Sequence, residues 1–149
     1  MHYKAIEGFY CTDSTFYIGE MEGKLGLLNS SREPLSEFIY DDIKMLGNDI
    51  IKARINGMLH LFNCEGNLIT PIKYKDVVVY YNPDLKGRYF VKDADGKVGM
   101  IDDEGNVLIP NEFERLDPIS HHKQVYGRKK NKIFHYDYNG NLVYLKEIR

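Results

Sequence analysis

One fifteen-residue pattern recurs along the sequence, and it constrains the fold more than any other feature does. Its best copy, GKVGMIDDEGNVLIP at residues 96–110, reads as an apolar strand, a polar turn and a second apolar strand. Asp102 can accept hydrogen bonds from the backbone ahead of it, and Gly105 stands where a tight turn needs a positive φ. The pattern therefore predicts a β-hairpin, with Pro110 ending the second strand or confining it to a sheet edge.

Three weaker copies follow the same plan at similar spacing. They are GKLGLLNSSREPLSE at 23–37, GMLHLFNCEGNLITP at 57–71 and NKIFHYDYNGNLVYL at 131–145. Gly66 and Gly140 occupy the place of Gly105, 39 residues before it and 35 residues after it. Arg32 takes this place in the first copy, so we expect that turn to be built differently. Periods of roughly 20 to 50 residues are typical of arrays whose units bury their apolar faces against one another.

Further strand-like segments flank each hairpin. An apolar or alternating segment precedes it, and a tail follows it that we expect to form a third strand of the same repeat. These tails are Tyr40–Ile43, Tyr74–Val77 and Phe113–Leu116. Val, Ile and Tyr are concentrated in all of these segments, which favours sheet over helix.

The sequence therefore predicts an all-β fold, a tandem array of about four three-stranded hairpin repeats in a single domain spanning residues 1–149. The repeats are approximately 16–48, 49–86, 87–122 and 123–149, with a partial repeat tail at 1–6. We expect an open stack of hairpins. A small closed propeller or barrel is the alternative, because the first tail is able to complete the last repeat and close a ring.

The recurring pattern resembles the bacterial WG repeat, and GKVGMIDDEGNVLIPNEFERL at 96–116 carries the resemblance best. The tryptophan that names the family is absent, and Leu25, Leu59, Val98 and Ile133 stand in its place. The resemblance implies a role in protein interaction and not in catalysis. A stand-alone domain of this size is also compatible with an immunity-type inhibitor that occludes a toxin.

Length, charge and cysteine usage set further limits. A chain of 149 residues buries enough surface to fold without disulfides or metal. The net charge of −2 gives no overall attraction to nucleic acid or to an anionic membrane. No apolar run is long enough for a membrane span and no export signal begins the chain, so we expect a cytoplasmic protein. Cys11 and Cys64 match no metal or redox spacing, which predicts two free thiols in a reducing compartment.

The sequence shows no catalytic or metal-binding constellation. The serines lie in predicted turns, and neither cysteine has a histidine beside it in sequence. An EF-hand-like count from Asp93 fails because Val98 occupies the required glycine position. His121 and His122 are adjacent and are not spaced as zinc ligands usually are. We expect no enzyme, no metal and no cofactor, with an enzyme whose site is assembled from loops as one alternative.

Protein recognition is the function that the repeat architecture favours, because repeats present aligned faces and variable connectors. The longest connector, between the second and third repeats, carries tyrosines, which suit the centres of interfaces. The predicted protein-binding residues are Tyr80, Tyr81, Asn82, Asp84, His121 and His122. The expected partner is another protein, and not a membrane. The competing expectation is that Tyr80 or Tyr81 packs back onto the array.

Nucleic-acid binding is the second alternative. Cations and aromatic rings alternate in the hairpin that leads into the last copy, as they do on surfaces that stack single-stranded bases. The predicted nucleic-acid-binding residues are Tyr126, Arg128, Lys129, Lys130 and Lys132. The slight net acidity of the chain argues against this function, and a short basic run is also typical of edge protection in sheets.

Overall fold

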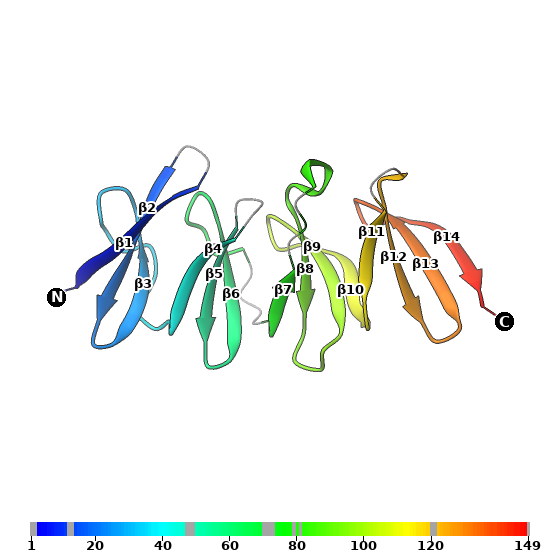
Figure 1. Cartoon of the computed structure of the whole chain (residues 1–149), viewed down its shortest axis with the longest axis horizontal. Coiled ribbons are helices and arrows are strands. Elements are labelled where there is room, and N and C mark those ends of the chain that lie inside the picture. Colours follow the sequence, from blue (N-terminus) through cyan, green and yellow to red (C-terminus); the bar gives the residue numbers. More distant parts are fainter. Residues whose placement is uncertain are drawn as a thin grey trace. The chain divides into compact units, whose positions relative to one another are not determined.

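The computed structural model describes residues 3–11, 14–46, 50–69, 74–78, 80, 82–119 and 122–148. These described residues form fourteen β-strands and one short 3-10 helix. The chain divides into two compact units, Met1–Lys73 and Tyr74–Arg149, and each unit contains two antiparallel sheets (Figure 1). The predicted all-β class is therefore confirmed.

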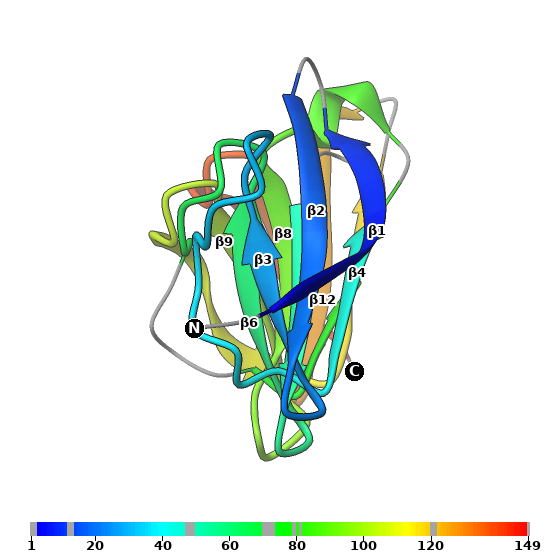
Figure 2. The ribbon, with the colours of Figure 1, turned by 90° about the vertical axis from the view of Figure 1, so that its left-hand side faces the viewer.

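The first unit consists of two three-stranded sheets. Sheet A contains β1 (Lys4–Cys11), β2 (Ser14–Met21) and β3 (Lys24–Leu28), and Figure 2 shows these three strands side by side. Sheet B contains β4 (Asp42–Leu46), β5 (Ile50–Ile55) and β6 (Met58–Asn63). Side chains from both sheets form one core, to which Phe16 and Leu27 contribute from sheet A and Ile51 and Phe62 from sheet B.

The second unit consists of two four-stranded sheets. Sheet C has the order β10 (Val107–Phe113), β9 (Val98–Asp102), β8 (Arg88–Lys92), β7 (Asp76–Val78). Sheet D has the order β11 (Leu116–Ile119), β12 (Gln124–Lys129), β13 (Lys132–Asp137), β14 (Leu142–Glu147). The helix η1 (Pro83–Leu85) lies between β7 and β8. Phe90 and Met100 of sheet C share a core with Val125 of sheet D.

The recurring hairpin forms as predicted. In the best copy, β9 pairs with β10, and Gly105 has a φ of 84°. The Oδ1 atom of Asp102 accepts hydrogen bonds from the backbone N–H groups of Glu104 and Asn106, at 2.9 Å and 2.8 Å. Pro110 does not end its strand, since β10 continues to Phe113 at the edge of sheet C with two register shifts. Pro110 therefore lies in an edge strand, which is the second of the two positions that the sequence predicted for it.

The first copy, which departs most from the recurring pattern, has the same turn geometry as the best copy. The expectation that its turn is built differently is therefore wrong. Asn29 takes the acceptor role, because its Oδ1 atom accepts from the N–H groups of Ser31 and Glu33, both at 2.9 Å. Arg32 adopts a φ of 64° in the glycine position. This left-handed conformation costs a non-glycine residue about 1 kcal/mol.

The tails do not form third strands of their own repeats. Tyr40 bridges back to Leu25, after which the chain enters β4 and pairs with β5 in the next sheet. The tails at 74–77 and 113–116 likewise lead into β7 and β11. Each sheet therefore takes its first strand from the tail before it, half a repeat out of phase with the predicted units. The single-domain organisation and the choice between an open stack and a closed ring stay predictions.

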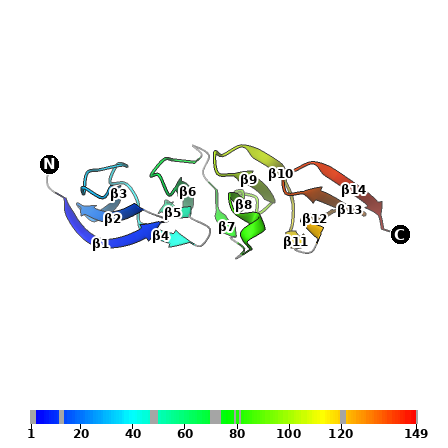
Figure 3. The same cartoon turned by 90° about the horizontal axis from the view of Figure 1, so that it is seen from above.

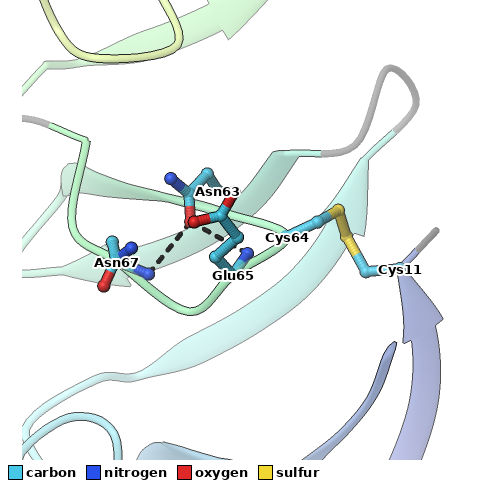
Figure 4. The surroundings of a disulfide bond; sticks show 5 residues. All are labelled: Cys11, Asn63, Cys64, Glu65 and Asn67. Carbon is cyan, nitrogen blue, oxygen red and sulfur yellow. Dashed lines mark hydrogen bonds between the residues drawn. A yellow bond between two sulfur atoms is a disulfide. The ribbon is translucent and has the colours of Figure 1, made fainter. Parts of the chain in front are cut away.

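A disulfide bond joins Cys11, at the end of β1, to Cys64, in the turn after β6 (Figure 4). The expectation of two free thiols is therefore wrong. The two Cα atoms are 5.3 Å apart although 53 residues separate them in sequence. The side-chain oxygen of Asn63 accepts from the N–H groups of Glu65 and Asn67, which fixes the turn that carries Cys64. Within the described residues, no helix is long and apolar enough to cross a membrane.

Candidate functional site

Tyr80, the first residue of the predicted protein-binding patch, packs onto the core of the second unit. Its ring meets the ring of Phe90 edge to face, with centroids 5.0 Å apart. Its hydroxyl donates to the carbonyl oxygen of Leu116 at 3.4 Å. Burial, and then the carboxylate of Asp117, raise the pKa of Tyr80 above its usual value. The structure thus places Tyr80 as the competing expectation did, as a residue that closes a gap in the array.

Of the other residues of that patch, the structure describes Asn82, Asp84 and His122. The Oδ1 atom of Asn82 accepts from the N–H of Asp84 at 3.0 Å and so caps η1. Asp84 and His122 are exposed in separate connectors. Tyr81 and His121 lie outside the described residues. The role of the whole patch in protein binding stays a prediction.

The predicted nucleic-acid-binding residues divide between the two faces of sheet D. Side chains alternate along β12, so Arg128 lies on one face and Lys129 on the other. The Nζ atom of Lys129 lies 3.0 Å from Glu112 Oε2, and it stands over the rings of Phe113 and Phe134 at 5.5 Å and 5.2 Å. Because Phe134 packs against Phe113 in this way, it cannot act as an exposed stacking surface.

A groove of about 710 Å³ lies beside these residues, between the hairpins of the second unit. Its lining consists of Lys97, Glu112, Glu114, Arg115, Arg128, Lys129 and Lys130. Ion pairs join Lys129 to Glu112, at 3.0 Å, and Lys97 to Glu114, at 4.0 Å. Much of the charge in the groove is therefore compensated locally. In the part of the chain that the structure describes, no group of three His, Cys, Asp or Glu side chains is placed to hold a metal ion.

An exposed row of aromatic side chains crosses sheet D. Tyr126, His135 and Tyr144 are register partners on β12, β13 and β14. The ring centroids of Tyr126 and His135 are 6.0 Å apart, and those of His135 and Tyr144 are 5.5 Å apart. Tyr126 is 37% exposed and Tyr144 is 53% exposed. The row lies on the face opposite Val125 and Phe134, which pack on the core side.

Cations and an isoleucine extend this row into a continuous surface. Arg128, Ile133 and Lys146 are register partners in the next position along the same three strands. Arg128 and Lys146 are exposed, and Ile133 is half-buried. We call this surface the ladder face, and its residues are Tyr126, Arg128, Ile133, His135, Tyr144 and Lys146. Tyrosine and arginine are the residue types most enriched among the energetically dominant residues of protein interfaces.

Sheet A shows what a covered face looks like in this chain. Gly19 and Gly26 are register partners on the face of sheet A opposite its core. The ring of Phe38 lies against both, since a Cβ atom added at either glycine would meet this ring at 3.0 Å or less. The ring of Tyr3 then packs on that of Phe38 at an angle of 31°, with centroids 5.2 Å apart. The described residues provide no comparable ring over the ladder face of sheet D.

The edge of sheet D is equally uncovered. Figure 3 shows β14 at this edge, beside β13. Every described residue of β14 is exposed, including Leu142 at 54% and Leu145 at 43%. Sequence reasoning found Tyr126 and Arg128 but missed His135, Tyr144 and the edge. Register across three strands brings these residues together, and the sequence pattern alone does not give that register.

Comparisons with known proteins support the all-β fold and give no information about the activity. Neither a family model nor a curated protein matches the sequence. The chain is similar to the crystal structure of the eukaryotic initiation factor, with a TM-score of 0.50 and 13% identity over 97% of this chain and 41% of that one. It is also similar to Kluyveromyces lactis Hsv2, with a TM-score of 0.42 and 14% identity over 97% and 51% of the two chains.

A third similar structure is the WD40 β-propeller domain of Doa1, with a TM-score of 0.35 and 10% identity over 94% of this chain and 53% of that one. This chain therefore spans about half the length of each structure, or less. Propellers are built from four-stranded antiparallel sheets. Sheets C and D have this number of strands, whereas sheets A and B have three strands each in the described residues.

Proposed function

We propose that the chain is a non-catalytic protein-recognition module that binds its partner through the ladder face of sheet D. The observation that carries this proposal is the row of Tyr126, His135 and Tyr144, which is held on three paired strands and has its two tyrosines exposed to solvent. Burying apolar surface gains about 25 cal/mol per Å², so an exposed aromatic row favours association. Arg128 and Lys146 add charged donors at the side of the row. Rigid strands also lose little entropy when a partner binds.

The same proposal includes the family, the role and the cellular location of the chain. The chain is a member of the bacterial WG-repeat family, supported by four copies of a hairpin whose turns share one hydrogen-bonding scheme. Its role is that of an immunity-type inhibitor that occludes a toxin. It works in the cytoplasm. Fractionation of the source cells tests the location. We expect the chain in the cytoplasmic fraction, and recovery from an extracytoplasmic fraction would contradict the assignment.

The binding surface is tested by affinity capture with matched variants. The wild-type chain, Tyr126→Ala/Tyr144→Ala and Tyr10→Ala are immobilised, and proteins from the source cells are passed over each. Tyr10 is a suitable control because it is 78% exposed on β1, in the other unit. We expect one protein to bind the wild type and Tyr10→Ala and to be lost from the double variant. A partner that binds all three chains equally would overturn the ladder face as the binding surface.

Nucleic-acid binding is the second candidate, because three cations of the β12–β13 hairpin remain exposed. Arg128, Lys130 and Lys132 make no ion pair within the described part of the chain. A fluorescently labelled single-stranded oligonucleotide is titrated at several salt concentrations. Binding that weakens steeply with salt, and that is lost on Lys130→Glu/Lys132→Glu, would favour this candidate. If the oligonucleotide does not bind at low salt, nucleic-acid binding is refuted.

A further inference from the structure

The edge of sheet D points to the kind of segment that the partner presents. We propose that β14 binds an extended, acidic segment of the partner protein, which joins sheet D as an added fifth strand. The inference rests on the proposed function, because it names the part of the protein partner that is bound. It concerns the edge of the sheet, whereas the ladder face is one of its two surfaces.

The backbone of β14 presents an open hydrogen-bonding edge. β14 is the last strand in the order of sheet D, and among the described residues it pairs only with β13. The N–H of Ile148 donates to the carbonyl oxygen of Asn131 at 2.6 Å, so the polar groups of Ile148 point toward the β13 side. These groups alternate in direction along an antiparallel strand. The N–H and C=O groups of Leu145 and Glu147 therefore point away from β13, where another strand can pair with them.

The outer strands of the other sheets are interrupted, whereas β14 has a single register shift, at Val143, and pairs with β13 without a break from Tyr144 to Glu147. In sheet C the outer strand β10 contains Pro110 and two register shifts. In sheets A and B, the segments that follow β3 and β6 form no strand in the described residues. They make only isolated bridges, between Pro34 and Leu28 and between Leu68 and Phe62. Leu145 stands five residues after its turn glycine, as Pro110 does in its own copy. The fourth copy has therefore lost the proline that removes a backbone donor from the edge.

The side chains of β14 also suit an added strand. Leu142, Val143 and Leu145 are all more than two-fifths exposed. The devices that usually protect an edge strand are limited here to the register shift at Val143 and the charges of Lys146 and Glu147 at the strand's end. Residues of an incoming strand lie opposite these side chains on both faces of the sheet. An extended segment with alternating apolar residues would cover Leu145 and Val143 and would extend the surface that contains Tyr144.

Charge decides which extended segment fits best. A hollow of about 480 Å³ beside the end of β14 is lined by Lys129, Lys130, Asn131, Lys132, Phe134 and Glu147. Glu112 neutralises Lys129, but Lys130 and Lys132 have no ion-pair partner within the described residues. Between Leu116 and Ile148 the sequence has six Lys and Arg residues against three Asp and Glu residues. An incoming strand that carries Asp or Glu as it passes Lys130 and Lys132 would satisfy this excess.

Two other occupants fit less well. A second copy of the chain, paired through its own β14 in antiparallel fashion, would bring the turn at Asn139–Asn141 to the lysines. This turn offers no free carboxylate, because Asp137 already accepts from the N–H groups of Asn139 and Asn141, both at 2.9 Å. A nucleic acid would satisfy the lysines but could not match the alternating donors and acceptors of a strand edge.

Selection from a displayed library of random ten-residue peptides tests the proposal, with the full-length chain as the immobilised target. We expect enriched peptides with alternating apolar residues and at least one Asp or Glu near one end. A synthetic copy of an enriched peptide should bind Leu145→Pro and Lys130→Glu/Lys132→Glu about tenfold more weakly than it binds the wild type or Leu145→Thr. Leu145→Thr is the matched control, because it keeps the backbone donor that proline removes. Lys130→Glu/Lys132→Glu changes only exposed side chains and remains informative if Leu145→Pro fails to fold.

The possible outcomes separate this proposal from the proposed function. Enriched peptides without acidic residues, or peptides that bind Leu145→Pro as tightly as the wild type, would overturn strand addition. Self-association in light scattering that is lost on Leu145→Pro would assign the edge to a second copy and would overturn it as well. If the captured partner requires Tyr126 and Tyr144 but binds Leu145→Pro normally, the ladder-face function stands and only the added strand is refuted.

Discussion

Two glycines with the same backbone conformation are expected to differ sharply in what a methyl group costs. Gly96 and Gly140 both have a φ of 84°. Both lie in turns where an aspartate accepts from two backbone N–H groups, Asp93 in one turn and Asp137 in the other. A Cβ atom added at Gly96 would meet nothing within 4 Å, whereas one at Gly140 would lie 2.1 Å from the carbonyl oxygen of Leu108.

The difference between the two sites follows from this geometry. Alanine in the left-handed conformation costs about 1 kcal/mol at either position. At Gly140 the clashing atoms are the backbone of Leu108 in β10, which cannot move without disturbing sheet C. Overpacking of this kind adds about 1 to 3 kcal/mol. We therefore expect Gly96→Ala to lower the free energy of unfolding by about 1 kcal/mol and Gly140→Ala to lower it by about 2 to 4 kcal/mol.

Urea denaturation of the two variants and the wild type measures this difference. The midpoint should fall further for Gly140→Ala, with an unchanged dependence of the unfolding free energy on urea. Equal losses of stability in the two variants would refute the reasoning, because they would show that the turn after β13 does not lie against the backbone of β10. A loss larger at Gly96 would refute it also.

Two further predictions concern the disulfide and the turn aspartates. Reduction of the bond between Cys11 and Cys64 should lower the unfolding free energy of the first unit by about 4 kcal/mol, since the bond closes a loop of 53 residues. Urea denaturation with and without reductant measures it, and a change under about 1 kcal/mol would contradict the pairing. Burial raises the pKa of Asp102, but hydrogen bonds from Asn106 and the turn backbone outweigh it and lower the pKa below the ordinary value of 3.8. The folded chain thus has the lower pKa, so the stabilisation is full above the unfolded value and is lost as the pH falls through the folded one. Asp102→Asn keeps the acceptor, as Asn63 does naturally, and acid titration of unfolding should show a smaller loss of stability below about pH 4. An identical acid profile would contradict this account.

The hairpins were predictable from the sequence because their causes are local. An aspartate or asparagine, two further residues and a glycine supply both the acceptor and the positive φ of each turn within four positions. Even the worn copy keeps Asn29 as its acceptor, which explains how Arg32 is tolerated in the glycine position. Local chemistry of this kind needs no knowledge of the rest of the fold.

The assignment of strands to sheets depends on packing between distant segments. A tail such as Tyr40–Ile43 has the same apolar character whether it pairs within its own repeat or with β5, so composition does not distinguish the two. The bond between Cys11 and Cys64 has the same origin, because only the packing of sheets A and B brings the sulfur atoms together. Sequence spacing reports neither contact.

The candidate site was visible only in part for the same reason. Tyr126 and Arg128 attract notice as a ring and a cation two residues apart. Their partners His135 and Tyr144 join them through the register of β13 and β14, which sequence patterning does not specify to the residue. Tyr80, in contrast, drew attention as a tyrosine in a connector, and in the structure its partly buried ring packs against Phe90.

Hydrogen–deuterium exchange on the complex with the captured partner tests most directly whether sheet D recognises a protein. Amide exchange is compared between the free and the bound chain. The same comparison is made with Tyr10→Ala, a change in the first unit that should leave the pattern of protection unaltered. The account predicts slower exchange in the bound chain at Leu142–Glu147 and little change at Pro83–Leu85. Protection confined to Pro83–Leu85, with β14 exchanging as fast as in the free chain, would contradict it.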